Sequence, residues 1–189
     1  MHIWIDIDNH KHVPLVKALV VELKERGHEV TVTAEDRYEI KQALQKNELN
    51  AKHIGRIFSI FGFFEKPLVI IRSVLLVNHL QKKKINIAFS LGSKPMAYTC
   101  NHTSTPIILF IQDYKQKVHW IHIALINSFF MFSDNTPDSL ILEHGYALEW
   151  IVKYKGNLQL ESTTHEIKTI KSIASQIEYS SRKMNPSKA

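Results

Sequence analysis

Hydrophobic and polar positions alternate in blocks along the first thirty-six residues, and the blocks predict a strand, a loop, a helix and a second strand. His2–Ile7 is a short apolar run rich in β-branched and aromatic residues, which is typical of a buried strand. Pro14 opens an amphipathic run that reaches Lys24, and Gly27 ends it before the strand-like stretch His28–Thr33. Because proline is tolerated in the first turn of a helix and glycine at its end, this segment predicts a parallel strand–helix–strand unit.

The same alternation continues over most of the chain. Further strands are predicted at 51–54, 86–90, 106–111 and 128–132, and helices at 38–47, 67–84, 94–101 and 137–144. Residues 117–126 would form either a helix or a partly ordered loop. This order predicts an α/β fold, a Rossmann-like doubly wound and mostly parallel sheet of about six strands. We expect the domain to span residues 1–156 and residues 157–189 to form a polar tail, either a surface helix before a disordered end or a helix that docks on a partner.

Composition and charge narrow the class of protein. A hydrophobic content of 44% supports a true core, and the single cysteine, Cys100, suggests a reducing compartment. Asp6 and Asp8 interrupt the first apolar run, which does not fit a secretory signal. The apolar stretch 68–80 is shorter than a membrane span, and the cations 82–84 that follow it suit the C-terminus of a helix. The net charge of +6 favours phosphates or an acidic membrane surface, but nucleic-acid motifs do not accompany it. We expect a cytoplasmic protein, with the inner face of the membrane as an alternative location.

Polar clusters follow each predicted strand and would therefore gather at one edge of the sheet, where open α/β sheets bind ligands. The first loop holds Asp8, Asn9, His10 and His12. A histidine beside a carboxylate suits general base chemistry, so we predict His12 as the base, with Asp6 or Asp8 orienting it or holding a substrate hydroxyl. A purely structural role for His12, capping or packing on the helix, is the alternative.

The remaining candidates are substrate-binding residues. A Gly-Ser turn that leads into a helix, Gly92-Ser93-Lys94, would present amides and a cation to an anion, although a simple capping turn fits the same pattern. The predicted substrate-binding set is Asn9, His10, Gly92, Ser93, Lys94 and Asp113. The histidine spacings do not match a zinc site, so we expect neither a metal nor a cofactor.

Four phenylalanines interrupt the connection between the third predicted strand and the long helix: Phe58, Phe61, Phe63 and Phe64. They would either fold back over the core or form an exposed apolar patch. Beside Arg56, Lys66 and Arg72, an exposed patch would suit a membrane interface and a lipid-linked substrate.

Several motifs point to a family. They are Trp4-Ile5-Asp6-Ile7 with Asn9 and His12, Arg26-Gly27-His28-Glu29-Val30, Ser90-x-Gly92-Ser93, Asp113, Asp134 with Pro137, and Tyr154-Lys155-Gly156. On these residues the chain resembles the N-terminal half of an uncharacterised, largely archaeal group of glycosyltransferase-B-like proteins, related to UDP-N-acetylglucosamine 2-epimerase and to the N-acetylglucosaminyltransferase that forms lipid II. The resemblance implies two Rossmann-like domains facing across a cleft, with the acceptor and often the base on the N-terminal one and the nucleotide sugar on the other.

The sequence departs from this pattern in three places. Leu91 stands where the resemblance implies histidine, Tyr114-Lys115 replaces an acidic–histidine pair after Asp113, and the chain stops where a linker to the second domain would begin. Three functions stay open. The chain would be the acceptor-side half of a glycosyltransferase or nucleotide-sugar-processing protein that needs a second domain or subunit, a truncated and inactive remnant, or a stand-alone module that binds a small anion or sugar.

Overall fold

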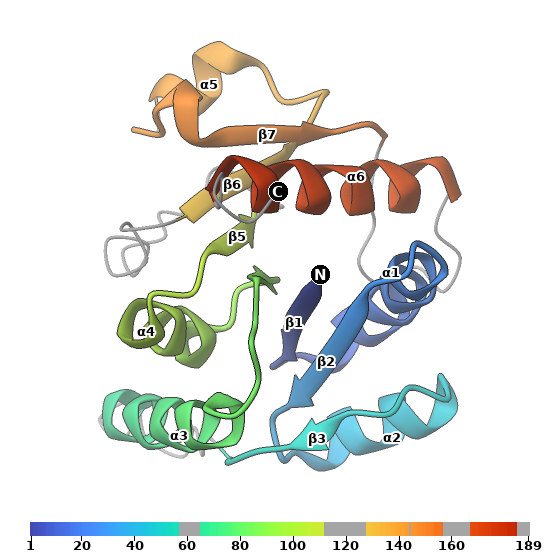
Figure 1. The fold of residues 1–189 in the computed structure, drawn as a ribbon, viewed down its shortest axis with the longest axis vertical. Helices are drawn as coiled ribbons and strands as arrows, with labels where there is room; N and C mark the ends of the chain where they lie inside the picture. The colour runs from blue at the N-terminus through green and yellow to red at the C-terminus, as the bar shows by residue number, and fades with distance from the viewer. Residues whose placement is uncertain (57–64, 112–127, 144, 157–166, 185–189) are drawn as a thin grey trace.

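A computed structural model describes residues 1–56, 65–111, 128–143, 145–156 and 167–184, and its centre is a single sheet of seven parallel strands (Figure 1). The strands are β1 His2–Ile7, β2 Glu29–Ala34, β3 Lys52–His53, β4 Ile87–Ser90, β5 Ile107–Phe110, β6 Ser128–Ser133 and β7 Ile151–Tyr154. They lie in the order β3-β2-β1-β4-β5-β6-β7. Neighbours in this order pair in parallel, which confirms the predicted doubly wound sheet.

Helices cover both faces of this sheet (Figure 1). They are α1 Val13–Glu25, α2 Tyr38–Lys46, α3 Glu65–Leu80, α4 Lys94–Thr103, α5 Asp138–Glu143 and α6 Ile167–Met184, with short 3-10 turns η1 His10–His12 and η4 Leu148–Trp150. Apolar side chains of α1, α2 and α6 pack on one face, and those of α3, α4 and α5 pack on the other. The segment 117–126, predicted as a helix or a partly ordered loop, lies outside the described residues. Among the described residues, no helix combines the length and the apolar character that a bilayer crossing needs.

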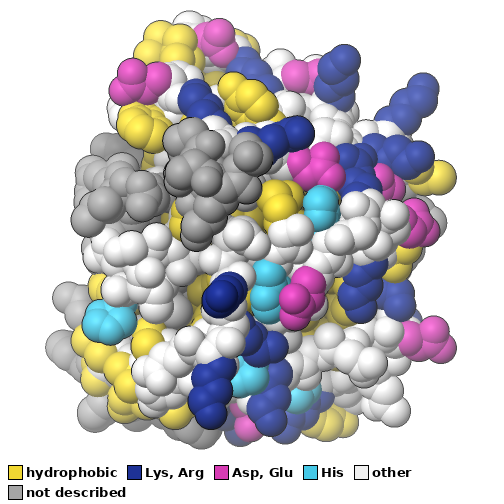
Figure 2. Space-filling model, in the orientation of Figure 1, with side chains coloured by type: hydrophobic (Ala, Val, Ile, Leu, Met, Phe, Trp, Pro, Cys, Tyr) yellow, Lys and Arg dark blue, Asp and Glu magenta, His cyan; other side chains and the backbone are white. Residues whose placement is uncertain are grey.

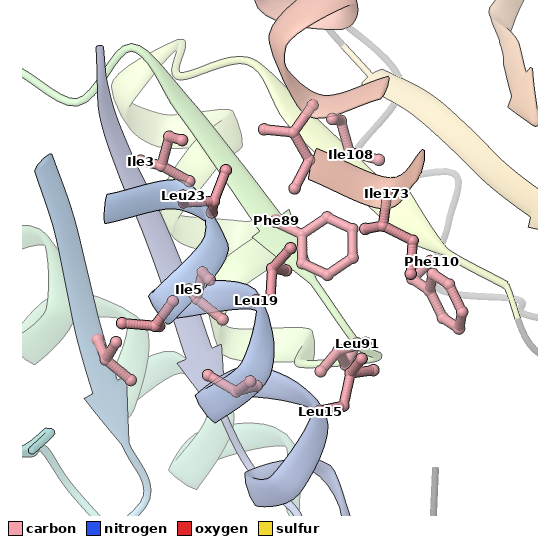
Figure 3. Packing of buried hydrophobic residues seen from close by; sticks show 14 of the residues in the cluster. Ile3, Ile5, Leu15, Leu19, Leu23, Phe89, Leu91, Ile108, Phe110 and Ile173 are labelled. Atoms are coloured by element: carbon pink, nitrogen blue, oxygen red, sulfur yellow. The ribbon is translucent and has the colours of Figure 1, made fainter. Parts of the chain in front are cut away.

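The first face is closed by alternate residues of β1 and by one stripe of α1. Ile3 lies beside Leu23, Ile5 lies toward Leu19 and Phe89 of β4, and Leu15 lies beside Leu91 (Figure 3). These side chains are buried, and each contributes about 1.5–3 kcal/mol relative to an exposed position. Since side chains of a strand alternate between faces, Trp4 and Asp6 face the other layer, which contains α3 and α4.

Helix α6 uses its apolar stripe within this chain. Ile170, Ile173 and Ile177 are buried in the core of the first face, and α6 packs on α1 and β7. Arg26 fixes the contact, since it donates to Ser175 Oγ at 3.0 Å and to Glu178 Oε2 at 3.2 Å. The predicted C-terminal helix is therefore present and completes one layer of the domain.

Strand β7 is the element that the sequence pattern did not predict. Its four residues place Lys153 between Val152 and Tyr154, so the apolar run is too short to indicate a strand. Parallel pairing with β6 and burial of Val152 and Tyr154 form the strand nevertheless. Burial also raises the pKa of Tyr154 to about 12.

Candidate functional site

The strand order reverses direction between β1 and β4, because the chain moves outward from β1 to β2 and β3 and then returns to β4 on the other side. In open parallel sheets, ligands bind at such a switch point, outside the carboxyl ends of the strands. Asp6 pairs in register with Ser90 of β4 and with Thr33 of β2. The loops that follow β1, β2 and β4 therefore begin side by side at one edge, which we call the carboxyl edge.

The loop after β1 turns at once into η1 and brings His12 back over Asp8. Asn9 caps η1, with its side-chain oxygen accepting from the Lys11 amide at 3.0 Å, while His10 is exposed. His12 is only 8% exposed, and its Nδ1 lies 3.6 Å from Asp8 Oδ1. That separation is too long for a hydrogen bond, and this buried Nδ1 has no hydrogen-bond partner among the described residues. Asp8, rather than Asp6, is thus the carboxylate next to His12.

Asp6 lies deeper and is completely buried. Its two oxygens accept hydrogen bonds from Arg72 Nη1 and Nη2, each at 2.8 Å, and from the hydroxyls of Thr33 and Ser93, each at 2.6 Å. These donors come from β2, α3 and the turn before α4. Asp6 therefore joins four segments of the fold, and its oxygens are occupied by protein donors.

Arg72 is the partner that sequence reasoning missed. The sequence analysis counts it among the cations beside a surface patch, but the side chain is 1% exposed and its Nε donates to the Ile54 carbonyl at 2.9 Å. Burial by itself lowers the pKa of Arg72, but the charge of Asp6 and the hydrogen bonds to it outweigh this and raise the pKa above its ordinary value. Arg72 is consequently a charged partner inside the domain, and it cannot face a membrane as the patch hypothesis assumed.

The turn after β4 has the geometry of a helix cap. Gly92 adopts a φ of +119°, and the amides of Gly92 and Ser93 both donate to Ser90 Oγ, at 3.2 and 3.1 Å. Ser93 is fully buried and is the N-cap of α4, accepting from the Met96 amide at 3.3 Å. The amides that an anion would need are thus already engaged, and Lys94, which is partly exposed, is the charged group of this turn.

A second acidic residue beside the first loop was not among the predicted site residues. Glu35, directly after β2, is completely buried, and its Oε1 accepts from Arg37 Nε at 2.7 Å. This hydrogen bond is the main cause that raises the pKa of Arg37, and the negative charge of Asp8 adds to it. Arg37 therefore lies near both carboxylates. Glu35 could have been identified from the sequence, because it belongs to the cluster of polar residues after the second predicted strand.

Other candidates lie outside this description. Asp113 and the four phenylalanines Phe58, Phe61, Phe63 and Phe64 fall outside the described residues. Within the described ranges, histidine, cysteine, aspartate and glutamate side chains do not form a group of three that could hold a metal ion. The described part of the carboxyl edge thus offers His12, Asp8 and Arg37, which suit proton transfer and the binding of polar groups, around the internally paired Asp6 and Arg72.

No family model matches the chain, and none of the curated proteins does either. Solved structures do match. UDP-GlcNAc 2-epimerase from Methanocaldococcus jannaschii, in complex with UDP-GlcNAc and UDP, aligns with a TM-score of 0.66 at 12% identity, over 82% of this chain and 46% of that one. UDP-GlcNAc 2-epimerase from Neisseria meningitidis aligns with a TM-score of 0.61 at 11% identity, over 100% of this chain and 52% of that one. MurG from Acinetobacter baumannii aligns with a TM-score of 0.57 at 13% identity, over 84% and 46%.

The chain therefore spans about half the length of the structures that it matches. At this level of identity the likeness establishes the fold, and it confirms the predicted relation to these enzymes at that level. The described domain has the Rossmann-like fold of one half of the glycosyltransferase-B architecture.

Proposed function

We propose that this chain is the acceptor-side domain of a glycosyltransferase-like or nucleotide-sugar-processing protein, and that a second domain or a partner subunit binds the donor. Two observations support the proposal. The chain corresponds to about half of MurG and of UDP-GlcNAc 2-epimerases, and two of those epimerase structures contain UDP-GlcNAc. Its most reactive side chains lie at the sheet switch point, where a ligand held between two such domains would lie.

The observation that carries the proposal is the buried His12 beside Asp8. An approach of less than 1 Å would turn their 3.6 Å separation into a hydrogen bond from Nδ1–H to the carboxylate, which would orient the ring. Nε2 of His12 would then accept the proton of an acceptor hydroxyl, and the hydroxyl oxygen would attack the anomeric carbon of a nucleotide sugar. The bond from that carbon to the nucleotide diphosphate would break, and the diphosphate would leave with its electron pair.

The other predicted residues have supporting roles in this mechanism. Asp6 would act through its neighbours, because its contacts to Arg72 and Ser93 hold the ends of β1 and the α4 turn in place. Of the residues predicted to bind substrate, we propose direct contacts for Asn9, His10, Lys94 and Asp113, whereas Gly92 and Ser93, whose amides already donate to Ser90 Oγ, would hold the turn that presents Lys94. Of these, Asn9 and His10 are exposed at the mouth of the first loop.

A reconstituted complex tests the role of His12. Native mass spectrometry of the tagged chain from its source cells would first identify a companion with a second Rossmann-like domain. In that complex we expect His12→Ala to lower turnover by about 10²- to 10⁴-fold, the usual contribution of a general base. His102→Ala, at an exposed histidine of α4, is the matched control and should leave turnover unchanged. Equal turnover of wild type and His12→Ala would remove His12 from the mechanism.

The two other functions make different predictions. A truncated and inactive remnant would remain a monomer near 21.9 kDa and would bind no sugar. A stand-alone module would bind a small anion or sugar directly, without a companion. Titration of the isolated chain with UDP-GlcNAc and with inorganic phosphate separates these two from each other and from the split-enzyme proposal.

A contact with the membrane is a second part of the proposal, and one observation favours it. Helix α3 exposes a stripe of four large aliphatic side chains, Ile70, Ile71, Val74 and Leu75, which are 42–56% exposed. Hydrophobic side chains lie at the lower left of Figure 2, over α3. Such a stripe suits insertion into the boundary of a bilayer. We therefore propose a cytoplasmic protein that contacts the inner face of the membrane, with Phe58, Phe61, Phe63 and Phe64 as further contacts. We also propose that the chain belongs to the largely archaeal group that it resembles.

Liposome flotation tests this part separately from catalysis. Ile71→Ser should reduce binding to vesicles while the fold, measured by circular dichroism, is unchanged. Val21→Ser is the matched control, because Val21 is similarly exposed on α1 on the other face of the sheet. Equal vesicle binding by all three proteins would exclude the stripe as the contact.

A further inference from the structure

The edge of the sheet where the strands begin, which we call the amino edge, contains a hollow that the proposed function does not use. It has a volume of about 730 Å³ and lies between the end of α3 and the end of α4. Its apolar walls are Leu80 and Ile85. Its polar lining consists of Gln81, Lys83, Lys84, Asn86, Thr103 and Thr105, so among the described residues two lysines and no carboxylate border it.

Other basic side chains lie near Lys83, one of the lining residues. Lys83 donates to Thr31 Oγ1 at 3.3 Å, and His2 shares the same hydroxyl at 2.7 Å. Burial lowers the pKa of His79, and the charges of Lys83 and Lys52 lower it further. Burial is the main cause that lowers the pKa of His2; the nearby Glu29 acts in the opposite direction, and the charge of Lys83 lowers the pKa further. Lys83 thus acts on two histidines at once, which indicates a concentration of positive charge at this edge.

The surface picture agrees with these contacts. Lys and Arg side chains gather below the centre of the face in Figure 2, with His side chains among them. An acidic side chain at this edge is Glu29, whose carboxylate lies 3.5 Å from His2 Nε2 and whose side chain is 70% exposed. A carboxylate that exposed, paired with His2, compensates little of the charge carried by the lysines.

The two threonine hydroxyls in the hollow already have hydrogen-bond partners, so a ligand would be recognised mainly by the lysines. Thr103 donates to the Thr99 carbonyl at 2.9 Å and lies 2.7 Å from the Thr105 hydroxyl. Recognition therefore depends on the two ammonium groups, which bind oxyanions as strong point charges. The volume exceeds that of one phosphate and matches a small-molecule site, and the apolar walls would contact the body of such a molecule.

We propose that the hollow between α3 and α4 binds the phosphate group of a phosphate-bearing ligand through Lys83 and Lys84. The ligand would be either a soluble phosphate compound or the headgroup of a lipid, because the recognising chemistry is the same. This site lies at the edge opposite His12 and does not depend on the proposed function.

Titration of the full chain with inorganic pyrophosphate tests the site, with affinity measured by calorimetry in 150 mM salt. Lys83→Gln/Lys84→Gln should weaken binding by about tenfold or more, since it removes two charge-assisted hydrogen bonds to the phosphate. Lys84→Gln alone should show part of the loss and spares the Lys83–Thr31 contact. Lys24→Gln/Lys46→Gln removes the same charge from exposed positions on α1 and α2 and should change affinity less than about twofold.

A spectroscopic readout checks the location. Bound pyrophosphate beside Lys83 would offset its charge, so the pKa of His79 followed by NMR should rise when the ligand is saturating. Absence of binding, equal affinity of the site variant and the control variant, or an unchanged pKa of His79 would overturn the proposal.

Vesicles distinguish the two sources of phosphate. The probes are phosphatidylcholine vesicles with and without 20% phosphatidylglycerol. Binding to the anionic vesicles that pyrophosphate displaces, and that the site variant loses, supports a lipid headgroup. Binding of pyrophosphate without binding of vesicles supports a soluble ligand. Vesicle binding that survives both pyrophosphate and the lysine substitutions, in a chain that does not bind pyrophosphate, counts against the site.

Discussion

At the carboxyl edge of the sheet, Asp6 and Arg72 are almost completely buried and neutralise each other, whereas at the amino edge Lys83 and Lys84 border an open hollow without a carboxylate among the described lining residues. The first pair is held by four segments of the fold and suits a positioning role. The second pair has charge that the protein does not compensate. The comparison suggests that the paired charges of Asp6 and Arg72 position other residues, whereas the charges of Lys83 and Lys84, unpaired among the described residues, are suited to binding an anionic ligand.

The largest effect should come from breaking the buried pair. Arg72→Met leaves the Asp6 carboxylate without its main partner in a dry interior and should lower the free energy of unfolding by about 3–5 kcal/mol. Urea denaturation measures the loss. Adding Asp6→Asn to the same protein should recover part of it, because no uncompensated charge remains. A loss below about 1 kcal/mol for Arg72→Met would mean that the pair is not buried as described.

A smaller loss should follow from removing one donor to Asp6. Ser93→Ala deletes the 2.6 Å hydrogen bond to the carboxylate and the N-cap of α4, and should lower the free energy of unfolding by about 2–3 kcal/mol. Thermal unfolding provides the measurement. Ser139→Ala, at an exposed serine of α5, should stay within about 0.5 kcal/mol of wild type. Equal effects of the two substitutions would contradict the network.

Histidines at the amino edge should make the free energy of unfolding depend on pH. The pKa values of His2 and His79 are below their ordinary value in the folded protein, mainly because both rings are partly buried. The unfolded chain therefore binds these protons more readily, so stability is full above about pH 6.5 and falls as the pH decreases below it. Each group contributes at most about 1.4 kcal/mol per pH unit. His2→Gln/His79→Gln should flatten the decline between about pH 7.5 and 5.5 in urea titrations, and an unchanged slope would refute this origin.

The smallest effect compares one lysine from each edge. Lys153 pairs with Asp138 and donates to the Thr136 carbonyl at 2.8 Å, so Lys153→Gln should cost about 0.2–1 kcal/mol. Lys84→Gln removes a cation from among cations and should leave stability unchanged or raise it by about 0.2–0.5 kcal/mol. Chemical denaturation at low salt resolves the difference in sign. If both substitutions lowered the free energy of unfolding, or both raised it, the proposed difference between the two edges would be wrong.

Much of the fold was predictable because its signals are local. The apolar run of β1 and the Pro14 and Gly27 boundaries of α1 identify the first unit, and the structure places those elements at His2–Ile7 and Val13–Glu25. Strand β7 was not predictable, since pairing with β6 rather than its own composition forms it. Helix α6 was predicted, but its weak apolar stripe left open whether its partner was this chain or another.

The site was predictable only where its residues are neighbours in sequence. Asp8 and His12 are four residues apart, and the sequence analysis placed them together. Arg72 lies 66 residues from Asp6, and a lone arginine in an apolar helix gives no sign of its partner. The sequence analysis explained the lysines after α3 by their favourable interaction with the helix dipole. The hollow could not be predicted, because Thr103 and Thr105 on its other side are distant in the sequence.

The Asp6–Arg72 contact also has a consequence for the history of this protein. Replacing either residue alone leaves a charge stranded in the interior, so a lineage that loses one should soon lose or exchange the other. Positions 6 and 72 are therefore expected to covary among homologous sequences, as an acid with a base or as two neutral residues.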